Sequence, residues 1–250
     1  DVGITLFSTP FDDTAVDLLE ELNTPAYKIA SFECTDLNLI KRVAYTNKPI
    51  IISTGMANDA EIGEAVETAI KFGSGELTLL HCVSGYPSPP DEYNLRTIAD
   101  MKNRFGVNVG LSDHTLSNVT AISAVALGAV MVEKHVTLDR NGGGPDDSFS
   151  LEEDGLMELC SATNTAWQAL GKVNYERTEA EKGNVKFRRS LYYVRSLQKG
   201  DVITENDIRS VRPGFGLPPK YYDKLIGSKV TKSVKENSPV TLESVNLKSD

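Results

Sequence analysis

Short apolar runs alternate with longer amphipathic segments through the first two-thirds of the chain. The runs predict six strands, at ITLFS (4–8), AYKIA (26–30), PIIIS (49–53), LTLLHC (77–82), VNVGLS (107–112) and VMVEKH (ending at His135). Apolar residues at three- and four-residue steps predict helices at DDTAVDLLEEL, DLNLIKRVAY, DAEIGEAVETAIKF, NLRTIADMKNRF, SNVTAISAVALG and LEEDGLMELCSATNTAWQAL. The expected N-caps are Asp12, Asp36, Asp59 and Ser117.

Strands that are apolar on both faces and separated by helices indicate a parallel α/β sheet with both faces covered. A doubly wound sheet and a barrel both accept six such units. Every predicted strand runs into a polar cluster, such as STPFD, SFECTD or KHVTLD, which favours a barrel mouth over a single switch point. A (β/α)8 TIM barrel needs eight units, so we expect the first two to precede Asp1.

The pattern changes towards the C-terminus. We expect residues 1–174 to form the partial TIM barrel and the polar residues 175–187 to form a linker. Residues 188–250 predict a small domain of short strands and turns around the loop PGFGLPP, with slight helix at NDI and KYYDKLI.

Composition narrows the class of protein. A net charge of −9 disfavours nucleic acid and anionic membrane surfaces as partners. No apolar run approaches the roughly 20 residues that span a bilayer, and the start of the chain does not resemble a signal peptide. Cys34, Cys82 and Cys160 lack metal-site spacing, which indicates reduced thiols in a cytoplasmic protein.

All three histidines fall at or just beyond predicted strand ends. Neighbouring strands would bring His114 and His135 together, which suits two imidazole ligands of a divalent metal, whereas His81 is expected to orient a neighbour. Lys28, inside an apolar strand, is a Schiff-base nucleophile, an anion ligand or a snorkelling side chain.

Further polar residues lie at or just beyond the ends of predicted strands. The hydroxyls of Thr9, Ser31 and Ser53 suit phosphate or carboxylate oxygens, and Glu33 points to the side of Ser31 if its strand continues. The loop GGGPDDSFS is expected to act as a lid or to allow close backbone approach, with Asp146 or Asp147 as its chemical group. By itself, Arg212 is expected to be a solvated surface residue.

Eight motifs, in order along the chain, resemble the sialic acid synthase family: STPFD, YKIASFE, KPIIISTGM, LLHCVSGYP, GLSDHT, EKH, GGPDDSFSLE and RPGFGLPPK. The family condenses phosphoenolpyruvate with an open-chain amino sugar and releases phosphate. Its fold is a β/α barrel with a C-terminal antifreeze-like (SAF) domain. The sequence is most similar to the pseudaminic acid synthases, which use 2,4-diacetamido-2,4,6-trideoxy-L-altrose; N-acetylneuraminate and legionaminate synthases are the alternatives.

The resemblance implies a metal-dependent transferase and a role for each matching residue. His114 and His135 match ligands of Mn²⁺, or of Mg²⁺ or Co²⁺. Lys28 matches the main cationic contact of phosphoenolpyruvate, and the other residues lining that site are Thr9, Ser31, Ser53 and Ser112. Glu33 matches an acid near the reacting carbons, with a candidate catalytic role.

The resemblance also covers the sugar side of the site. Tyr86 and Asp146 match residues that contact the sugar or hold the site's shape, and Asp146 is a candidate catalytic group. Ser84 stands where some members carry Asn, as a candidate substrate contact. Arg212 matches an arginine delivered into the partner subunit's barrel, which implies a domain-swapped homodimer and replaces the surface interpretation of this residue.

Two other hypotheses stay open. A Schiff-base aldolase would use Lys28 as its nucleophile. A protein of another class, namely an inactive fragment or a carbohydrate-binding protein, would carry the same residues without turnover.

Overall fold

The computed structural model describes residues 3–73 and 75–247. The chain divides into two compact units, Asp1–Lys172 and Val173–Asp250, and each has a hydrophobic core of its own.

The first unit is built on a five-stranded parallel sheet in the order β1-β2-β3-β4-β5. Its strands are β1 (Tyr27–Ile29), β2 (Ile50–Ser53), β3 (Leu77–Cys82), β4 (Asn108–Asp113) and β5 (Val132–Lys134). These confirm five of the six predicted strands. The sheet is a curled half-barrel, and among the described residues β1 and β5 are its two ends.

The remaining prediction, a strand at ITLFS (4–8), is wrong. Only Ser8 makes a parallel bridge, to Tyr27, and its carbonyl accepts the Lys28 backbone N–H at 3.4 Å. The apolar side chains of this segment are largely exposed, Ile4 by 79% and Leu6 by 85%. Without burial, this segment gains too little from apolar contact to hold a ladder of hydrogen bonds.

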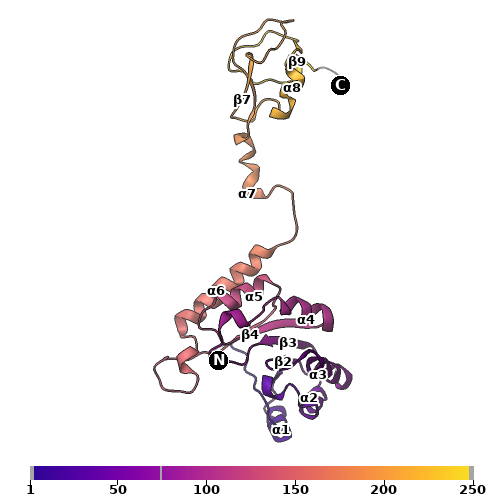
Figure 1. Ribbon diagram of the computed structural model, residues 1–250, viewed down its shortest axis with the longest axis vertical. Helices are drawn as coiled ribbons and strands as arrows, with labels where there is room; N and C mark the ends of the chain where they lie inside the picture. Colours follow the sequence, from indigo (N-terminus) through magenta and orange to yellow (C-terminus); the bar gives the residue numbers. More distant parts are fainter. Residues whose placement is uncertain (1–2, 74, 248–250) are drawn as a thin grey trace. The chain divides into compact units, whose positions relative to one another are not determined.

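Six helices lie in the predicted places, the first before β1 and one after each of the five strands, and they line the outer side of the curled sheet (Figure 1). They are α1 (Asp13–Glu21), α2 (Leu37–Ala44), α3 (Asp59–Phe72), α4 (Thr97–Phe105), α5 (Val119–Ala126) and α6 (Glu153–Leu170). One core, which includes Ile29, Ile52, Leu79 and Val109, fills the space between sheet and helices. The single-turn 3₁₀ helices of this unit are η1 (Ser31–Glu33), η2 (Pro90–Glu92) and η3 (Asp147–Phe149).

Two of the four predicted N-caps are confirmed. The carboxylates of Asp12 and Asp36 accept backbone N–H groups of the first turns of α1 and α2. The N-cap of α3 is Asn58 rather than Asp59, because Asn58 forms a capping box with Glu61. The N-cap of α5 is Asn118 rather than Ser117.

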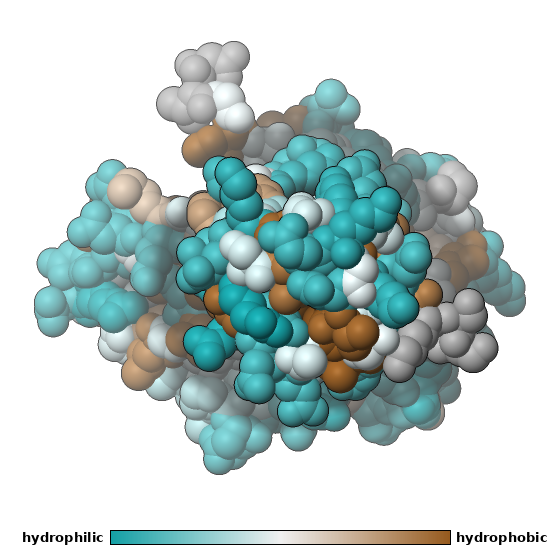
Figure 2. Space-filling model, turned by 90° about the horizontal axis from the view of Figure 1, so that it is seen from above, coloured by the Kyte–Doolittle hydropathy of each residue, from teal (hydrophilic) through white to brown (hydrophobic). Residues whose placement is uncertain are grey.

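The second unit contains two antiparallel pairs around its own core. β6 (Ser190–Tyr193) pairs with β7 (Ile208–Val211), and β8 (Lys229–Val230) pairs with β9 (Val245–Asn246). Leu191, Tyr193 and Ile203 are among its buried residues. Side chains on the face seen in Figure 2 are mostly hydrophilic.

This unit contains little helix, as predicted, but only one of the two segments predicted to be helical forms a helix. KYYDKLI overlaps η5 (Pro219–Tyr221) and contains α8 (Tyr222–Leu225), whereas NDI is a turn leading into β7. The buried Asp207 carboxylate accepts the Thr204 backbone N–H and pairs with Arg195, which closes that turn. The remaining helical turns are α7 (Glu179–Lys182), η4 (Val185–Phe187) and η6 (Leu242–Ser244), and α7 and η4 lie in the segment predicted as a linker. Among the described helices, none is long and apolar enough to cross a membrane.

Candidate active site

The strand register sorts side chains onto two faces of the sheet. Lys28 is opposite Ile51, so Ser53, two residues farther along β2, shares its face. Cys82, Ser112 and Glu133 are opposite one another on β3, β4 and β5. We call this side, which faces away from the helices, the inner face.

Glu133 joins the two ends of the curled sheet on the inner face. Its Oε2 lies 3.4 Å from Lys28 Nζ, and its Oε1 accepts a hydrogen bond from Ser112 Oγ at 2.8 Å. Because β1 and β5 are the first and last strands of the sheet order, this ion pair crosses the hollow of the half-barrel. Sequence reasoning missed Glu133, although its two-residue spacing from His135 on a strand places both on one side.

Polar side chains at the ends of β1 and β2 include two atoms with no partner. Ser31 Oγ accepts the Gly55 N–H at 3.2 Å and lies 3.5 Å from Cys82 Sγ. Within the described chain, buried Ser53 Oγ and Glu33 Oε2 have no hydrogen-bond partner. Burying a polar group without a partner costs about 1–3 kcal/mol, so such groups are expected to meet a ligand or water.

Thr9 and Ser84 lie at the edges of this region. Thr9 follows Ser8, which bridges to Tyr27 and whose carbonyl accepts the Lys28 N–H, so Thr9 lies alongside β1. A Cβ added at Gly55 would lie 2.2 Å from Ser84 Oγ and 2.8 Å from Ser31 Oγ. Glycine there is what lets the two serines approach one another.

The imidazoles of His114 and His135 lie side by side, with ring centroids 5.3 Å apart. His114 Nδ1 is 2.9 Å from the Val83 carbonyl, and His135 Nδ1 is 3.3 Å from Asp146 Oδ2. An acceptor at each Nδ1 favours the tautomer that keeps its proton there, which leaves both Nε2 atoms as lone-pair donors. This donor set fits a divalent ion. The described residues contain no group of three or more His, Cys, Asp or Glu for one, so water or substrate oxygens would supply the remaining ligands.

Aromatic rings enclose the histidine pair. The Tyr86 ring centroid is 4.3 Å from that of His114 and 6.0 Å from that of His135. The Phe149 centroid is 5.1 Å from that of His135 and 5.8 Å from that of Tyr86. These contacts restrict both imidazoles. Phe149 lies within the motif GGPDDSFSLE, but nothing in the sequence assigned it a role in the site.

Two neighbouring aspartates of the Gly-rich loop differ in what they contact. Asp146 faces His135, as given above. Asp147 accepts hydrogen bonds from Thr137 Oγ1 at 2.6 Å and from the Gly144 N–H at 2.7 Å. These two bonds lower the pKa of Asp147. Asp147 therefore holds the loop together, and Asp146 is the member at the site.

The two imidazoles have pKa values shifted in opposite directions. Burial lowers the pKa of His135, and the nearby His114 lowers it further. For His114, burial acts downward, but hydrogen bonds with Cys82 and with the Val83 carbonyl outweigh it and raise the pKa. These shifts make His114 the more basic of the two imidazoles.

His81 lies apart from this pair. Its side chain meets the Tyr93 carbonyl, and burial lowers its pKa. Tyr93 in turn accepts the His114 backbone N–H through its hydroxyl at 2.7 Å. Tyr93 therefore links His81 to the site.

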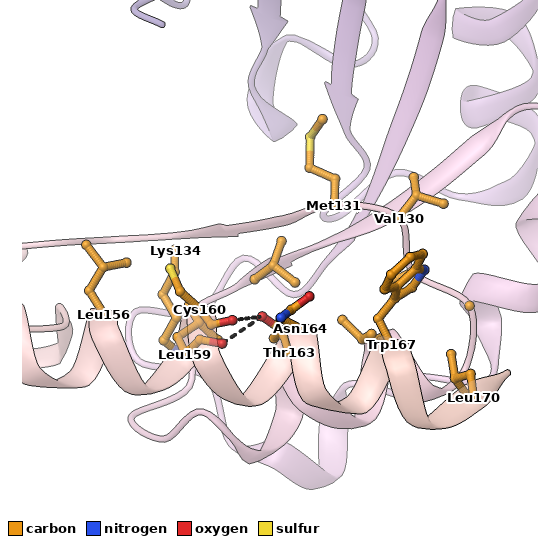
Figure 3. A pocket seen from close by; sticks show the side chains of 14 residues that line it. Val130, Met131, Lys134, Leu156, Leu159, Cys160, Thr163, Asn164, Trp167 and Leu170 are labelled. Carbon is orange, nitrogen blue, oxygen red and sulfur yellow. Dashed lines mark hydrogen bonds between the residues drawn. The ribbon is translucent and has the colours of Figure 1, made fainter. Parts of the chain in front are cut away.

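The outer face of β4 and β5 carries a buried ion pair. Lys134 Nζ lies 2.7 Å from Asp113 Oδ2 and also donates to the carbonyls of Thr115 and Ser117. Lys134 also lines an apolar groove of about 670 Å³ between segment 125–134 and α6, beside Trp167 and Leu170 (Figure 3). Since the Lys134 ammonium is fully engaged, the groove offers hydrophobic contact rather than chemistry.

The predicted site residue Arg212 lies in the second unit. It is exposed and directly follows β7.

Comparison with known proteins assigns a family to each unit. Residues 1–175 match the NeuB family and residues 188–246 match the SAF domain. The chain is 41% identical to a pseudaminic acid synthase of Helicobacter pylori over 249 residues, covering 98% of this chain and 72% of that protein. It is 40% identical to an N,N'-diacetyllegionaminic acid synthase of Campylobacter jejuni, covering 94% of this chain and 71% of that protein.

A solved structure shows the same fold. The spore coat polysaccharide biosynthesis protein of Bacillus subtilis superposes with a TM-score of 0.65 at 32% identity, covering 98% of this chain and 74% of that one. Together with the family match over most of the sequence, this similarity shows that the chain belongs to the NeuB family.

Proposed function

We propose that this protein is a pseudaminic acid synthase. It condenses phosphoenolpyruvate with 2,4-diacetamido-2,4,6-trideoxy-L-altrose to a nine-carbon 2-keto sugar acid and releases phosphate. The observation that carries the proposal is the inner face itself, where buried Lys28 and the unpartnered Ser53 hydroxyl share one face with the His114–His135 pair. The similarity to the Helicobacter pylori enzyme supports this sugar acid.

The strand-end residues position phosphoenolpyruvate. The Lys28 ammonium and the hydroxyls of Ser31, Ser53 and Ser112 bind its phosphate and carboxylate oxygens, with Thr9 at the edge. Their contribution is orientation and charge stabilisation. C3 of phosphoenolpyruvate then attacks the aldehyde carbon, water adds at C2, and the resulting tetrahedral centre expels phosphate.

The other residues contact the sugar or accept a proton from the attacking water. The unpartnered oxygen of Glu33 accepts a proton from the attacking water. Asp146 orients His135, while Tyr86 and Ser84 border the sugar. His114 and His135 hold Mn²⁺, or another divalent ion, which when bound supplies Lewis acidity toward the sugar's aldehyde oxygen.

Lys28 is better placed as an anion ligand than as a Schiff-base nucleophile. A nucleophilic lysine must be neutral, and enzymes favour that form with apolar surroundings or a second cation nearby. Here the neighbour is the Glu133 carboxylate, 3.4 Å away, rather than a second cation or a wholly apolar pocket. Borohydride treatment with substrate present is therefore expected to attach no sugar to Lys28.

The proposal extends to the whole protein. Eight β/α units would close the half-barrel, and Arg212 of one subunit would complete the site of the other in a domain-swapped homodimer. Within the described residues, no carboxylate forms an ion pair with the exposed Arg212, which leaves its guanidinium available to an anionic ligand. The free thiols of Cys34 and Cys82 are typical of a cytoplasmic enzyme.

A phosphate-release assay tests the proposal. Protein supplied with Mn²⁺ and phosphoenolpyruvate is offered the altrose derivative, N-acetylmannosamine or the legionaminate precursor. We expect kcat/KM for the altrose derivative to exceed the others by about tenfold or more. Preference for another sugar would reassign the substrate, and binding of sugar without phosphate release would favour the carbohydrate-binding alternative.

A further inference from the structure

Glu133 takes no part in the roles proposed above, yet it contacts two residues that do. Its carboxylate is 3.4 Å from Lys28 Nζ and 2.8 Å from Ser112 Oγ. The first contact comes from β1 and the second from β4, so one side chain on β5 ties together groups from three strands.

Burial makes Lys28 dependent on this contact. The Lys28 side chain is 9% exposed, whereas that of Glu133 is 41% exposed. Among the described residues, the Lys28 ammonium has one further acceptor, the Ile29 carbonyl at 3.4 Å. A lysine side chain has a flexible four-carbon stem, so a buried ammonium stays in one place only if its acceptors hold it there.

Glu133 exerts two opposite effects on an anionic ligand. Its negative charge repels phosphate and carboxylate groups, but water screens the charge of a side chain that is 41% exposed. Its ion pair with the Lys28 ammonium and the hydrogen bond that it accepts from Ser112 Oγ orient both groups, and the Lys28 side chain is largely excluded from water. The orienting effect therefore outweighs the repulsion.

We infer that Glu133 is a positioning residue for phosphoenolpyruvate: it fixes Lys28 Nζ and Ser112 Oγ where they receive the phosphate and carboxylate oxygens. The inference rests on the proposed function. Glu133 acts through these two residues and does not itself touch the reacting atoms.

Two substitutions separate position from charge. Glu133→Gln keeps the length and an oxygen for Ser112, but it removes the anionic acceptor of Lys28. Glu133→Asp keeps the charge and draws it back by one methylene, out of reach of both partners. Glu67→Gln, an exposed carboxylate on α3, is the matched control.

Steady-state phosphate release by the whole chain with Mn²⁺ is the measurement. We expect both Glu133 variants to raise KM for phosphoenolpyruvate by about tenfold, with kcat and the KM of the sugar within about twofold of the unsubstituted protein. Glu67→Gln is expected to change none of these. Calorimetric titration with phosphoenolpyruvate alone is expected to show the same loss of affinity.

Other results overturn the inference. If repulsion dominated, Glu133→Gln would lower KM for phosphoenolpyruvate and Glu133→Asp would leave it unchanged. A purely structural role would lower kcat and the affinities for both substrates together, along with the thermal unfolding temperature. If the unsubstituted protein bound phosphoenolpyruvate normally but released no phosphate, the proposed function would fail while the binding comparison still decided the role of Glu133.

Discussion

β4 and β5 carry two polar pairs at consecutive register positions, one on each face of the sheet. On the outer face, Asp113 and Lys134 are buried, and every donor of the Lys134 ammonium has an acceptor. On the inner face, Ser112 and Glu133 border the hollow of the half-barrel, where the Ser53 hydroxyl has no partner among the described residues. A polar pair whose donors and acceptors all have protein partners stabilises the fold. A pair that lies beside groups without partners is available to a ligand.

Breaking the outer pair is expected to have the largest effect. Lys134→Met leaves the Asp113 carboxylate buried without a counter-charge, so the free energy of unfolding should fall by about 3–5 kcal/mol. Chemical denaturation monitored by circular dichroism measures this. The control is Lys182→Met, whose exposed pair with Glu179 should contribute less than about 1 kcal/mol. Equal losses in the two variants would contradict the structural role of the outer pair.

Substitution beside the histidine pair should alter metal binding rather than stability. Asp146→Asn weakens the acceptor at His135 Nδ1, and we expect about 10–100-fold lower affinity for Mn²⁺. Isothermal titration with Mn²⁺ measures it, with the exposed Asp91→Asn as the control. Unchanged affinity would mean that Asp146 does not orient a metal ligand.

Removing the unpartnered hydroxyl should cost binding and no stability. Ser53→Ala deletes a buried group that bonds to no described residue, so the free energy of unfolding should be unchanged or slightly higher. KM for phosphoenolpyruvate should rise about tenfold, because a hydrogen bond to a charged ligand is lost. Ser228→Ala is the control: its hydroxyl donates to the Lys224 carbonyl at 2.8 Å, so stability should fall while KM stays constant. If Ser53→Ala instead lowered stability and left KM constant, Ser53 would have a structural role.

The smallest effect concerns the third histidine and pH. Burial lowers the pKa of His81 in the folded protein, so the unfolded chain takes up its proton first as the pH falls through its ordinary value of 6.5. Stability from this residue is therefore present above that pH and is lost below it. His81→Gln should make the free energy of unfolding less dependent on pH between about 7.5 and 5.5. An unchanged slope would mean that His81 does not contribute to acid destabilisation.

Strand and helix positions in the first unit were largely predictable, because each element buries a continuous apolar run or stripe. ITLFS (4–8) has the composition of a strand but lacks the burial that a strand needs, and burial is a property of the whole fold. The N-cap at Asn58 was missed for a local reason, since its capping box with Glu61 outweighs the neighbouring Asp59. Glu133 was missed because only the curl of the sheet brings it to Lys28.

The sequence by itself determined the alternation of strands and helices, the placement of polar residues at strand ends and the motifs that resemble the sialic acid synthase family. Only the tertiary structure decided which side chains from different elements contact one another on each face of the sheet. In the folded chain the Asp146 carboxylate faces His135, whereas that of Asp147 bonds within its own loop. The curl of the sheet also brings β1 and β5 close enough for Lys28 and Glu133 to form an ion pair. Local periodicity fixes the side of an element on which a residue lies, but contact between distant elements depends on how the sheet curls.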